Sequence, residues 1–228
     1  MLRTRAIAEE QMDAPDLAPD IYARVLNDLA RVNDVTMARR PTLEFLERLP
    51  RSDAPLRVLD VGFGDGDMLR AIARWAAKRS LAVDLAGIDL NPRSAAIAQA
   101  KTPINASIEY RTGDYATLAG ESWDVVISSL VAHHMTTAQL LVFLRFMDKE
   151  AGRGWFINDL HRHGFAWAGY PLLARLAGWH RIVREDGQLS IARSYRPAEW
   201  PPLLAQAGVS SARVRRVFPF RLCVEKIR

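Results

Sequence analysis

The feature that most constrains the fold of this chain is an alternation of short apolar runs with helical stretches, which begins near residue 56 and continues to residue 160. The apolar runs are RVLDVG, AVDLAGID, SIEYRTGD, WDVVISS and GWFIND. Their length and their content of Val, Ile and Leu predict strands, and continuous apolar runs are typical of parallel strands that are covered on both faces. We therefore expect an α/β fold with a doubly wound, mostly parallel sheet.

The two ends of the chain add further elements. The last two β-rich runs, ARVRRVF and RLCVEK, are separated by only two residues, so they must form an antiparallel hairpin and bring the sheet to seven strands. Apolar residues at helical spacing predict two helices over residues 21–49. We expect residues 1–55 to form an N-terminal helical cap and residues 56–228 to form the main domain. Within that domain, residues 160–195 are expected to be a lid insert with about one helix.

Composition narrows the function classes. Apolar residues make up 49% and charged residues 25% of the chain, as in a folded globular protein, and no apolar run reaches the roughly 18 residues of a spanning helix. The single cysteine, Cys223, excludes an intrachain disulfide and a Cys-rich zinc site. The first residues become acidic before an apolar signal-peptide core begins, so we expect a cytoplasmic protein. Residues 213–228 carry an excess charge equal to the net charge of +5, and we expect these cations to protect a sheet edge rather than bind a nucleic acid.

A glycine loop follows the first predicted strand directly. Its glycines are Gly62, Gly64 and Gly66. Glycines allow close backbone approach, and the N-terminus of the next helix offers free N–H groups to a ligand. The G-x-G-x-x-G dinucleotide fingerprint would need a glycine at position 67, and the Gly-Lys-Ser/Thr of a P-loop is missing. Asp60, Asp65 and Asp67 make the loop acidic, so we expect a ligand that is cationic here.

Two more carboxylates end the second and third predicted strands. Asp89 is placed to accept hydrogen bonds from the hydroxyls of a ribose, and Asp114 to accept one from an exocyclic amine such as that of adenine. Each of them, taken alone, is also typical of a helix cap. Together with the glycine loop they favour a nucleoside site.

The segments VLDVGFGDGDM, GIDLNP, RTGDY and WDVVISSLVAHHMT resemble, in order and spacing, the successive motifs of class I S-adenosylmethionine-dependent methyltransferases. The resemblance covers about residues 56–160 and implies a Rossmann-like fold, methyltransferase activity and S-adenosylmethionine as the cofactor. The cofactor residues that it implies are Asp60, Gly62, Phe63, Gly64, Gly66, Asp89, Leu90, Asp114, Tyr115, Ser129 and Leu130.

The resemblance also implies a division of labour within this set. The glycine loop would hold the methionine portion of the cofactor, and Asp89 would hold the ribose. Asp114 with Tyr115 would hold the adenine, and Ser129 with Leu130 would face the sulfonium. The segments NDLHRHGF and DGQLSIARSYRPAEW resemble a bacterial subgroup that methylates small secondary metabolites, including phenolic polyketides.

The sequence lacks motifs that are typical of methyltransferases acting on macromolecules. An exocyclic-amine nucleic-acid methyltransferase would have an Asp/Asn-Pro-Pro-Tyr/Phe turn after the fourth strand, where this chain reads SSLV. For a metal site, Asp159 lacks evident carboxylate partners, and the histidines lack the i, i+4 spacing of helical zinc motifs. We expect metal-free transfer to a small, aromatic or polyketide-like molecule, most simply at an oxygen.

Four of the five histidines follow the fourth and fifth predicted strands. They are His133, His134, His161 and His163. The carboxyl ends of neighbouring strands meet at the edge where open α/β sheets bind ligands, and histidine suits proton removal near neutral pH. We predict that at least one of them is the catalytic base. The structural alternatives are a cap for the following helix and a solvated turn.

Several alternatives stay open at this stage. The aromatic residues of the lid are Phe165, Trp167, Tyr170 and Trp179, which favour either a wall for a flat apolar substrate or core and dimer contacts. Rival functions are an RNA-directed methyltransferase that uses the basic C-terminal strands, a nicotinamide oxidoreductase, and a catalytically silent cofactor-binding homologue. The glycine spacing disfavours the oxidoreductase. The protein is expected to be a monomer or a homodimer.

Overall fold

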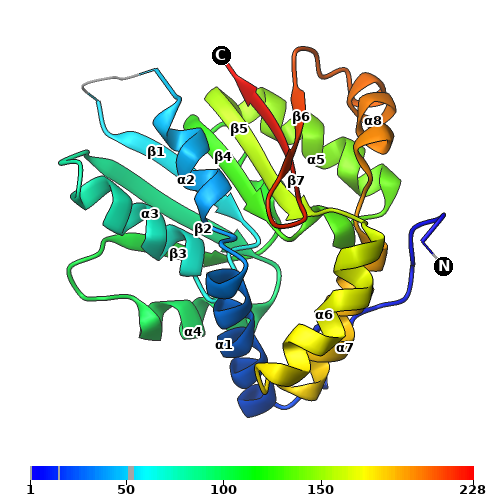
Figure 1. The fold of residues 1–228 in the computed structure, drawn as a ribbon. Coiled ribbons are helices and arrows are strands. Elements are labelled where there is room, and N and C mark those ends of the chain that lie inside the picture. The colour runs from blue at the N-terminus through cyan, green and yellow to red at the C-terminus, as the bar shows by residue number, and fades with distance from the viewer. Residues whose placement is uncertain (1, 15, 51–53) are drawn as a thin grey trace.

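One seven-stranded sheet organises the molecule, which a computed structural model describes over residues 2–14, 16–50 and 54–228. The strands are β1 (Leu56–Val61), β2 (Val83–Asp89), β3 (Ile108–Thr112), β4 (Trp123–Ser129), β5 (Ala151–Leu160), β6 (Arg213–Val217) and β7 (Arg221–Ile227). Their order in the sheet is β3-β2-β1-β4-β5-β7-β6 (Figure 1). The first five strands are parallel, and β7 runs antiparallel to both β5 and β6. The predicted doubly wound, Rossmann-like sheet and its C-terminal hairpin are confirmed.

Helices connect the strands and cover both faces of the sheet. The α-helices are α1 (Pro19–Val35), α2 (Arg40–Glu47), α3 (Asp67–Ala77), α4 (Pro92–Lys101), α5 (Thr137–Glu150), α6 (Gly164–Leu176), α7 (Arg181–Arg193) and α8 (Trp200–Ala207). The short 3-10 helices are η1 (Gln11–Asp13), η2 (Tyr115–Leu118), η3 (Ala132–His134) and η4 (Pro197–Glu199). None of these described helices is long and apolar enough to cross a membrane.

Successive residues of the central strands point to opposite faces, so the sheet has two apolar cores. On β5, Trp155 and Ile157 pack toward α5 and α8, whereas Phe156 packs toward α2 and α3. Phe156 stacks on Phe45 of α2 with ring centroids 4.9 Å apart. Because both faces are covered, the polar side chains at the strand ends are left to face the carboxyl edge of the sheet.

The lid insert differs from its prediction, because residues 160–195 hold two helices rather than about one. Helix α6 ends before Gly178, which has a positive φ of 68° that an L side chain rarely adopts. Helix α7 then begins after His180, whose ring nitrogen accepts a hydrogen bond from the Ile182 N–H. Gly178 was the stop signal in the sequence that marked this boundary.

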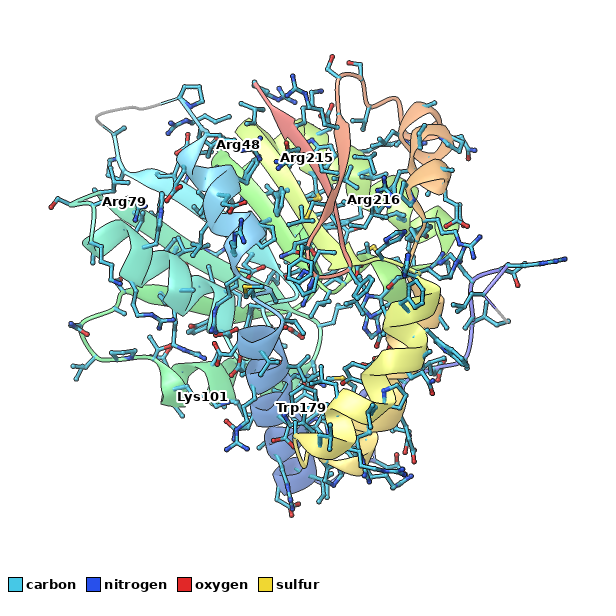
Figure 2. The ribbon with its side chains drawn as sticks, in the orientation of Figure 1. Arg48, Arg79, Lys101, Trp179, Arg215 and Arg216 are labelled. Carbon is cyan, nitrogen blue, oxygen red and sulfur yellow. The ribbon has the colours of Figure 1, made fainter. Side chains whose placement is uncertain are left out.

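Helix α1 and the two lid helices meet on the same side of the molecule. Figure 1 shows α1 and the α6–α7 pair projecting from the same end of the sheet. A small apolar cluster joins them, in which Val25 of α1 packs with Trp179, Ile182 and Val183. Trp179 is labelled in Figure 2. This contact forms a roof over the carboxyl edge of the parallel strands.

The segment between α1 and α2 is tied to the sheet by a buried amide. The Asn158 Nδ2 on β5 donates to the Ala38 carbonyl at 2.6 Å and lies 3.4 Å from the Thr42 hydroxyl. Asn158→Ala should cost about 1–3 kcal/mol of unfolding free energy, because the buried carbonyl loses its donor. Urea denaturation measures this loss.

Hydrogen exchange should show that the loss acts on the α1–α2 connection. Amides near Ala38 are expected to exchange faster in Asn158→Ala. In the control Ser128→Ala they should be unchanged, because the Ser128 hydroxyl donates only to Val61 within the sheet. Equal exchange in both variants would contradict this assignment.

Candidate functional site

A cavity of about 700 Å³ opens at the carboxyl edge of the sheet. Its walls come from the glycine loop after β1, the loops after β2 and β4, helix α1 and the lid helices. These segments are far apart in sequence. The sheet brings them together between β1 and β4, where the order of its strands reverses. In open α/β sheets this switch point is the place where ligands bind.

The three glycines of the loop have different structural roles. All three have positive φ values, but a Cβ at Gly62 would overlap the Val131 side chain and one at Gly66 would meet the Tyr110 ring. A Cβ at Gly64 would come no closer than 3.9 Å to the described atoms outside its own stretch of chain, and that atom is on Leu26. Gly62 and Gly64 line the cavity, whereas Gly66 does not. The side of the loop at Gly64 is therefore open to a ligand.

The charge of this loop differs from the sequence expectation. The Asp65 carboxylate lies 2.8 Å from the Lys101 Nζ and 3.3 Å from an Arg70 nitrogen, and Asp67 pairs with Arg39. Cations from α3, α4 and the α1–α2 connection thus offset two of the three acids. The acidic loop inferred from the sequence is largely neutralised, because pairing across the fold is invisible in the local sequence.

Asp60 is the acid of this group that keeps an unpaired oxygen. Its side chain is buried and lines the cavity, and its Oδ1 has no hydrogen-bond partner among the described residues. Burial, with the negative charges of Asp89 and Asp67, raises the pKa of Asp60 to about 8. A buried carboxyl with this pKa keeps its proton near neutral pH, and a cation placed beside it would favour its ionised form.

Asp89 and Asp114 have different surroundings. The Asp89 carboxylate accepts from the Gly64 N–H at 2.9 Å and from the Asn91 N–H at 2.8 Å, and burial raises its pKa against these two bonds. Asp89 lines the cavity and fixes the glycine loop. Asp114 is exposed, does not line the cavity and caps η2 by accepting from the Ala116 N–H. For Asp114 the structure therefore shows the cap that the sequence left as an alternative.

The other expected cofactor residues all lie at the cavity. They are Phe63, Leu90, Tyr115, Ser129 and Leu130. Leu130 has a positive φ of 62°, which is uncommon for a leucine and marks a constrained turn after β4.

The four histidines occupy two separate places. His133 and His134 line the main cavity, whereas His161 and His163 line a second hollow of about 260 Å³ beside the C-terminal hairpin. The expectation that all four share one edge is too simple. The chain after β5 turns toward the hairpin, where the His161 N–H donates to the Phe220 carbonyl.

His133 is held by a carboxylate at its Nδ1. The ring is buried, and its Nδ1 lies 2.7 Å from the Asp159 Oδ1, while the His133 backbone N–H donates to the Asp159 Oδ2 at 2.9 Å. A carboxylate only accepts, so Nδ1 carries the hydrogen. Asp159 lacked evident partners in the sequence, but in the structure both of its carboxylate oxygens have hydrogen-bond donors.

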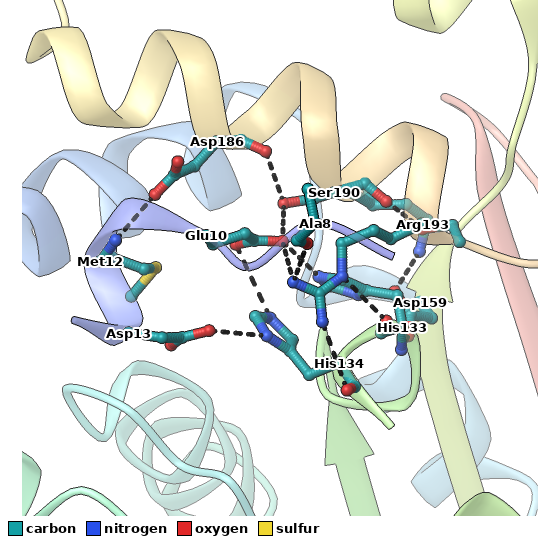
Figure 3. Close-up of polar contacts among 12 residues, drawn as sticks. Ala8, Glu10, Met12, Asp13, His133, His134, Asp159, Asp186, Ser190 and Arg193 are labelled. Carbon is teal, nitrogen blue, oxygen red and sulfur yellow. Dashed lines mark hydrogen bonds and ion pairs between the residues drawn. The ribbon is translucent and has the colours of Figure 1, made fainter. Parts of the chain in front are cut away.

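Two functional residues were missed by the sequence reasoning. Glu10 and Asp13 come from the N-terminal segment. Glu10 lies near His133, and Asp13 lies near His134 (Figure 3). The Glu10 Oε1 lies 3.5 Å from the His133 Nε2, and the Asp13 Oδ2 lies 3.1 Å from the His134 Nδ1. The sequence carried only an acidic patch at this point, and its role depends on contacts more than 100 residues away.

These contacts set the protonation of the buried groups. Burial alone would lower the pKa of His133, but the charge and hydrogen bond of Asp159, with a contribution from Glu10, raise it to about 9. Burial opposes ionisation of Glu10 and Asp159, yet the charge of His133 holds the pKa of each carboxyl below its usual range. At this polar corner of the cavity, the His133 ring therefore lies between the carboxylates of Asp159 and Glu10.

The opposite wall of the cavity is apolar. It is formed by Leu26 and Leu29 of α1 with Phe165, Tyr170 and Leu173 of α6. Of the four lid aromatic residues, only Phe165 and Tyr170 line the cavity.

The other two lid aromatic residues lie elsewhere. Trp179 is buried in the roof cluster, and Trp167 does not contribute to the cavity wall. The lid aromatics therefore divide between a pocket wall and a core.

Comparison with known proteins identifies a methyltransferase domain within the chain. The family model described as "Methyltransferase domain" matches residues 58–149. The chain carries a class I methyltransferase domain. No curated protein sequence matches the chain.

Solved methyltransferase structures share the fold. A magnesium protoporphyrin IX methyltransferase (ChlM) from Synechocystis PCC 6803 with bound SAH is 18% identical, with 96% of this chain and 91% of that chain covered at a TM-score of 0.59. The plantazolicin methyltransferase BpumL in complex with SAH is 15% identical, with 95% and 91% covered at a TM-score of 0.66. A putative O-methyltransferase from Nostoc punctiforme PCC 73102 is 18% identical, with 99% and 64% covered at a TM-score of 0.64. At these identities the similarity shows the fold alone.

The raised pKa of Asp60 gives this methyltransferase a testable pH dependence. The folded protein keeps a proton that the unfolded chain releases above the ordinary pKa of 3.8, so Asp60 makes unfolding easier as the pH rises toward about 8. In Asp60→Asn, the free energy of unfolding should fall less between about pH 5 and about pH 8 than in the parent protein. Urea denaturation at both pH values measures the difference.

The exposed Asp84, at the start of the neighbouring strand β2, supplies the matched control. Asp84→Asn should keep the pH dependence of the parent protein. A parental pH dependence in Asp60→Asn as well would show that Asp60 is ionised in the folded state.

Proposed function

We propose that this protein transfers the methyl group of S-adenosylmethionine to a hydroxyl of a small aromatic or polyketide-like molecule. One observation carries the proposal: a single cavity joins the Gly64–Asp89 side, the His133–His134 corner and an apolar wall. Its volume of about 700 Å³ lies within the range of about 300–1,000 Å³ typical of small-molecule sites.

The residues on the glycine-loop side fit the cofactor. The unpaired Oδ1 of Asp60 offers an acceptor to the ammonium of the methionine portion, and the open side of Gly64 allows close backbone approach. We assign the ribose to Asp89 and the adenine to Tyr115 with Leu90, which line the cavity, whereas Asp114 does not line it. Ser129 and Leu130 border the sulfonium side. The bound cofactor supplies an electrophilic methyl group, and the chain's task is to place the nucleophile in line with it.

The substrate class follows from the other two walls. Phe165, Tyr170 and the leucines of α1 offer apolar surface to a flat ring, while His133 and His134 offer polar atoms to a hydroxyl. One of the similar structures is described as a putative O-methyltransferase, which supports oxygen as the acceptor.

Charge pairing supports a small molecule over a nucleic acid. Arg48 and Arg215, which Figure 2 labels, both pair with Glu225. Lys226 and Arg228 pair with Asp148. Arg221 is buried. Several cations that made the C-terminal sequence basic are therefore neutralised or hidden.

The direct test is turnover. The protein is incubated with S-adenosylmethionine and a panel of phenols and polyketide-like hydroxy compounds, and products are examined by mass spectrometry for a gain of one methyl group. Binding of the cofactor without transfer to any member of a broad panel would favour the catalytically silent alternative.

Asp89→Ala should weaken S-adenosylmethionine binding by about 2–3 kcal/mol, roughly 30- to 150-fold, through loss of ribose hydrogen bonds and of the Gly64 anchor. Isothermal titration calorimetry measures the affinity. Asp84→Ala, at the other end of the same strand, should bind normally. Unchanged affinity in a folded Asp89→Ala protein would remove Asp89 from the cofactor site.

Loss of the group that handles the hydroxyl proton should lower turnover on the order of 10²–10⁴-fold, and His133→Ala and His134→Ala test the two candidates at the cavity. Cofactor affinity should stay near that of the parent protein. His161→Ala and His163→Ala provide matched controls from the second hollow and should keep near-parental rates. The reverse pattern would move the reaction centre to the second hollow.

A further inference from the structure

We propose that Glu10, His133 and His134 bind one divalent transition-metal ion at the polar corner of the cavity. Each residue offers a ligand atom, and the three atoms lie within 4.8 Å of one another. All three residues line the cavity, and Glu10 and His133 are almost fully buried. The proposal departs from the metal-free reaction expected from the sequence, where Glu10 was not recognised as a partner of the histidines.

The two imidazole rings are oriented as metal ligands are. Each ring has its Nδ1 against a carboxylate, Asp159 for His133 and Asp13 for His134. Each ring therefore turns its Nε2 toward the Glu10 carboxylate, with 3.5 Å from the His133 Nε2 to Oε1 and 3.8 Å from the His134 Nε2 to Oε2 (Figure 3). A carboxylate at the far nitrogen is the usual outer partner of a metal-bound histidine, because it fixes the tautomer and raises the basicity of the ligand.

The separations match the spacing of donors around one ion. Donors held about 2.1 Å from a metal at the tetrahedral angle lie about 3.4 Å from each other. The Nε2 to oxygen distances of 3.5 and 3.8 Å are close to this value and longer than the usual hydrogen bond. The geometry leaves room for an ion between the rings and the carboxylate.

Glu10 is held in place although it comes from the start of the chain. The Ser190 hydroxyl donates to its Oε1 at 2.8 Å, and Arg193 lies 3.9 Å from the same oxygen. The segment around it is fixed to α7, because the Gln11 and Met12 N–H groups donate to Asp186. The ligand set is thus preorganised on both sides.

The donor types select the class of ion. Two imidazole nitrogens and one carboxylate suit Zn²⁺, Fe²⁺, Mn²⁺ or Co²⁺, whereas Mg²⁺ and Ca²⁺ prefer all-oxygen sites. Three protein ligands leave a coordination position open to an exchangeable group, as in catalytic zinc sites. That position would face the cavity that the three residues line.

The catalytic consequence rests on the proposed function. A substrate hydroxyl at the open position would lose its proton to water more readily, because the cation stabilises the alkoxide or phenolate. The oxygen then forms the new O–C bond to the methyl group as the S–C bond breaks, and the bonding electron pair returns to sulfur. His133 and His134 would act in this step as ligands.

The first experiment measures metal binding on the full chain without a polyhistidine tag. After chelator treatment and its removal, calorimetric titration with Zn²⁺ should show one equivalent bound, and Co²⁺ should give the visible spectrum of a site with low coordination number. Glu10→Gln, His133→Ala and His134→Ala should each abolish this binding. Asp159→Asn, which leaves all three ligands in place, should weaken it about 10- to 100-fold.

Matched controls come from the same residue type elsewhere. His161→Ala and His163→Ala should bind Zn²⁺ as the parent does, and Mg²⁺ should not compete. Thermal unfolding of each variant checks its folding. If a ligand variant fails to fold, Asp159→Asn and the Co²⁺ spectrum of the parent protein still decide the question.

The proposal is overturned if the parent protein binds no equivalent of Zn²⁺ or if loss of the three ligands leaves binding unchanged. Full turnover by the metal-free enzyme would overturn the catalytic use of the ion. Cofactor binding and methyl transfer are measured separately. A chain that binds the metal at this corner but transfers no methyl group would contradict the proposed function and support the metal site.

Discussion

The pairing of Asp159 with His133 is the interaction on which the site depends. A carboxylate buried at the end of a central strand is stable only if its oxygens are hydrogen-bonded. Asp159 meets this need with the His133 ring and with the backbone N–H groups of His133 and Leu160. The loop after β4 is thereby fixed to the end of β5, which orients both histidines toward the cavity and the N-terminal segment.

The sheet was predictable from the sequence because its signals are local. Continuous apolar runs and a two-residue connection between the last strands determine seven strands and a hairpin without knowledge of distant contacts. The lid was predicted less well. The apolar residues of its second helix do not recur at a clear helical spacing. The start of this helix is marked instead by the turn at Gly178 and the cap at His180. Gly178 was a local turn signal at this point, but the prediction gave more weight to the aromatic residues of the segment.

The polar site was only half predictable, for a physical reason. Glycines and acids at strand ends indicate a ligand edge because parallel strands end together, so Gly64 and Asp89 were identified at the cavity. The charge at that edge depends on Arg39 and Lys101, which come from other elements. Glu10 likewise reaches His133 only through the path of the folded N-terminal segment. Pairing between distant residues leaves no spacing pattern in a single sequence.

The route of the N-terminal segment has a consequence for the order in which the molecule is completed. Glu10 is synthesised before its hydrogen-bond partner Ser190, which follows 180 residues later. Arg5 likewise waits for Arg193 and Tyr195. The five parallel strands end at Leu160, so they are synthesised before the partners of this segment, whereas β6 and β7 follow those partners. The polar corner of the cavity therefore includes a segment that is synthesised long before the residues that hold it in place.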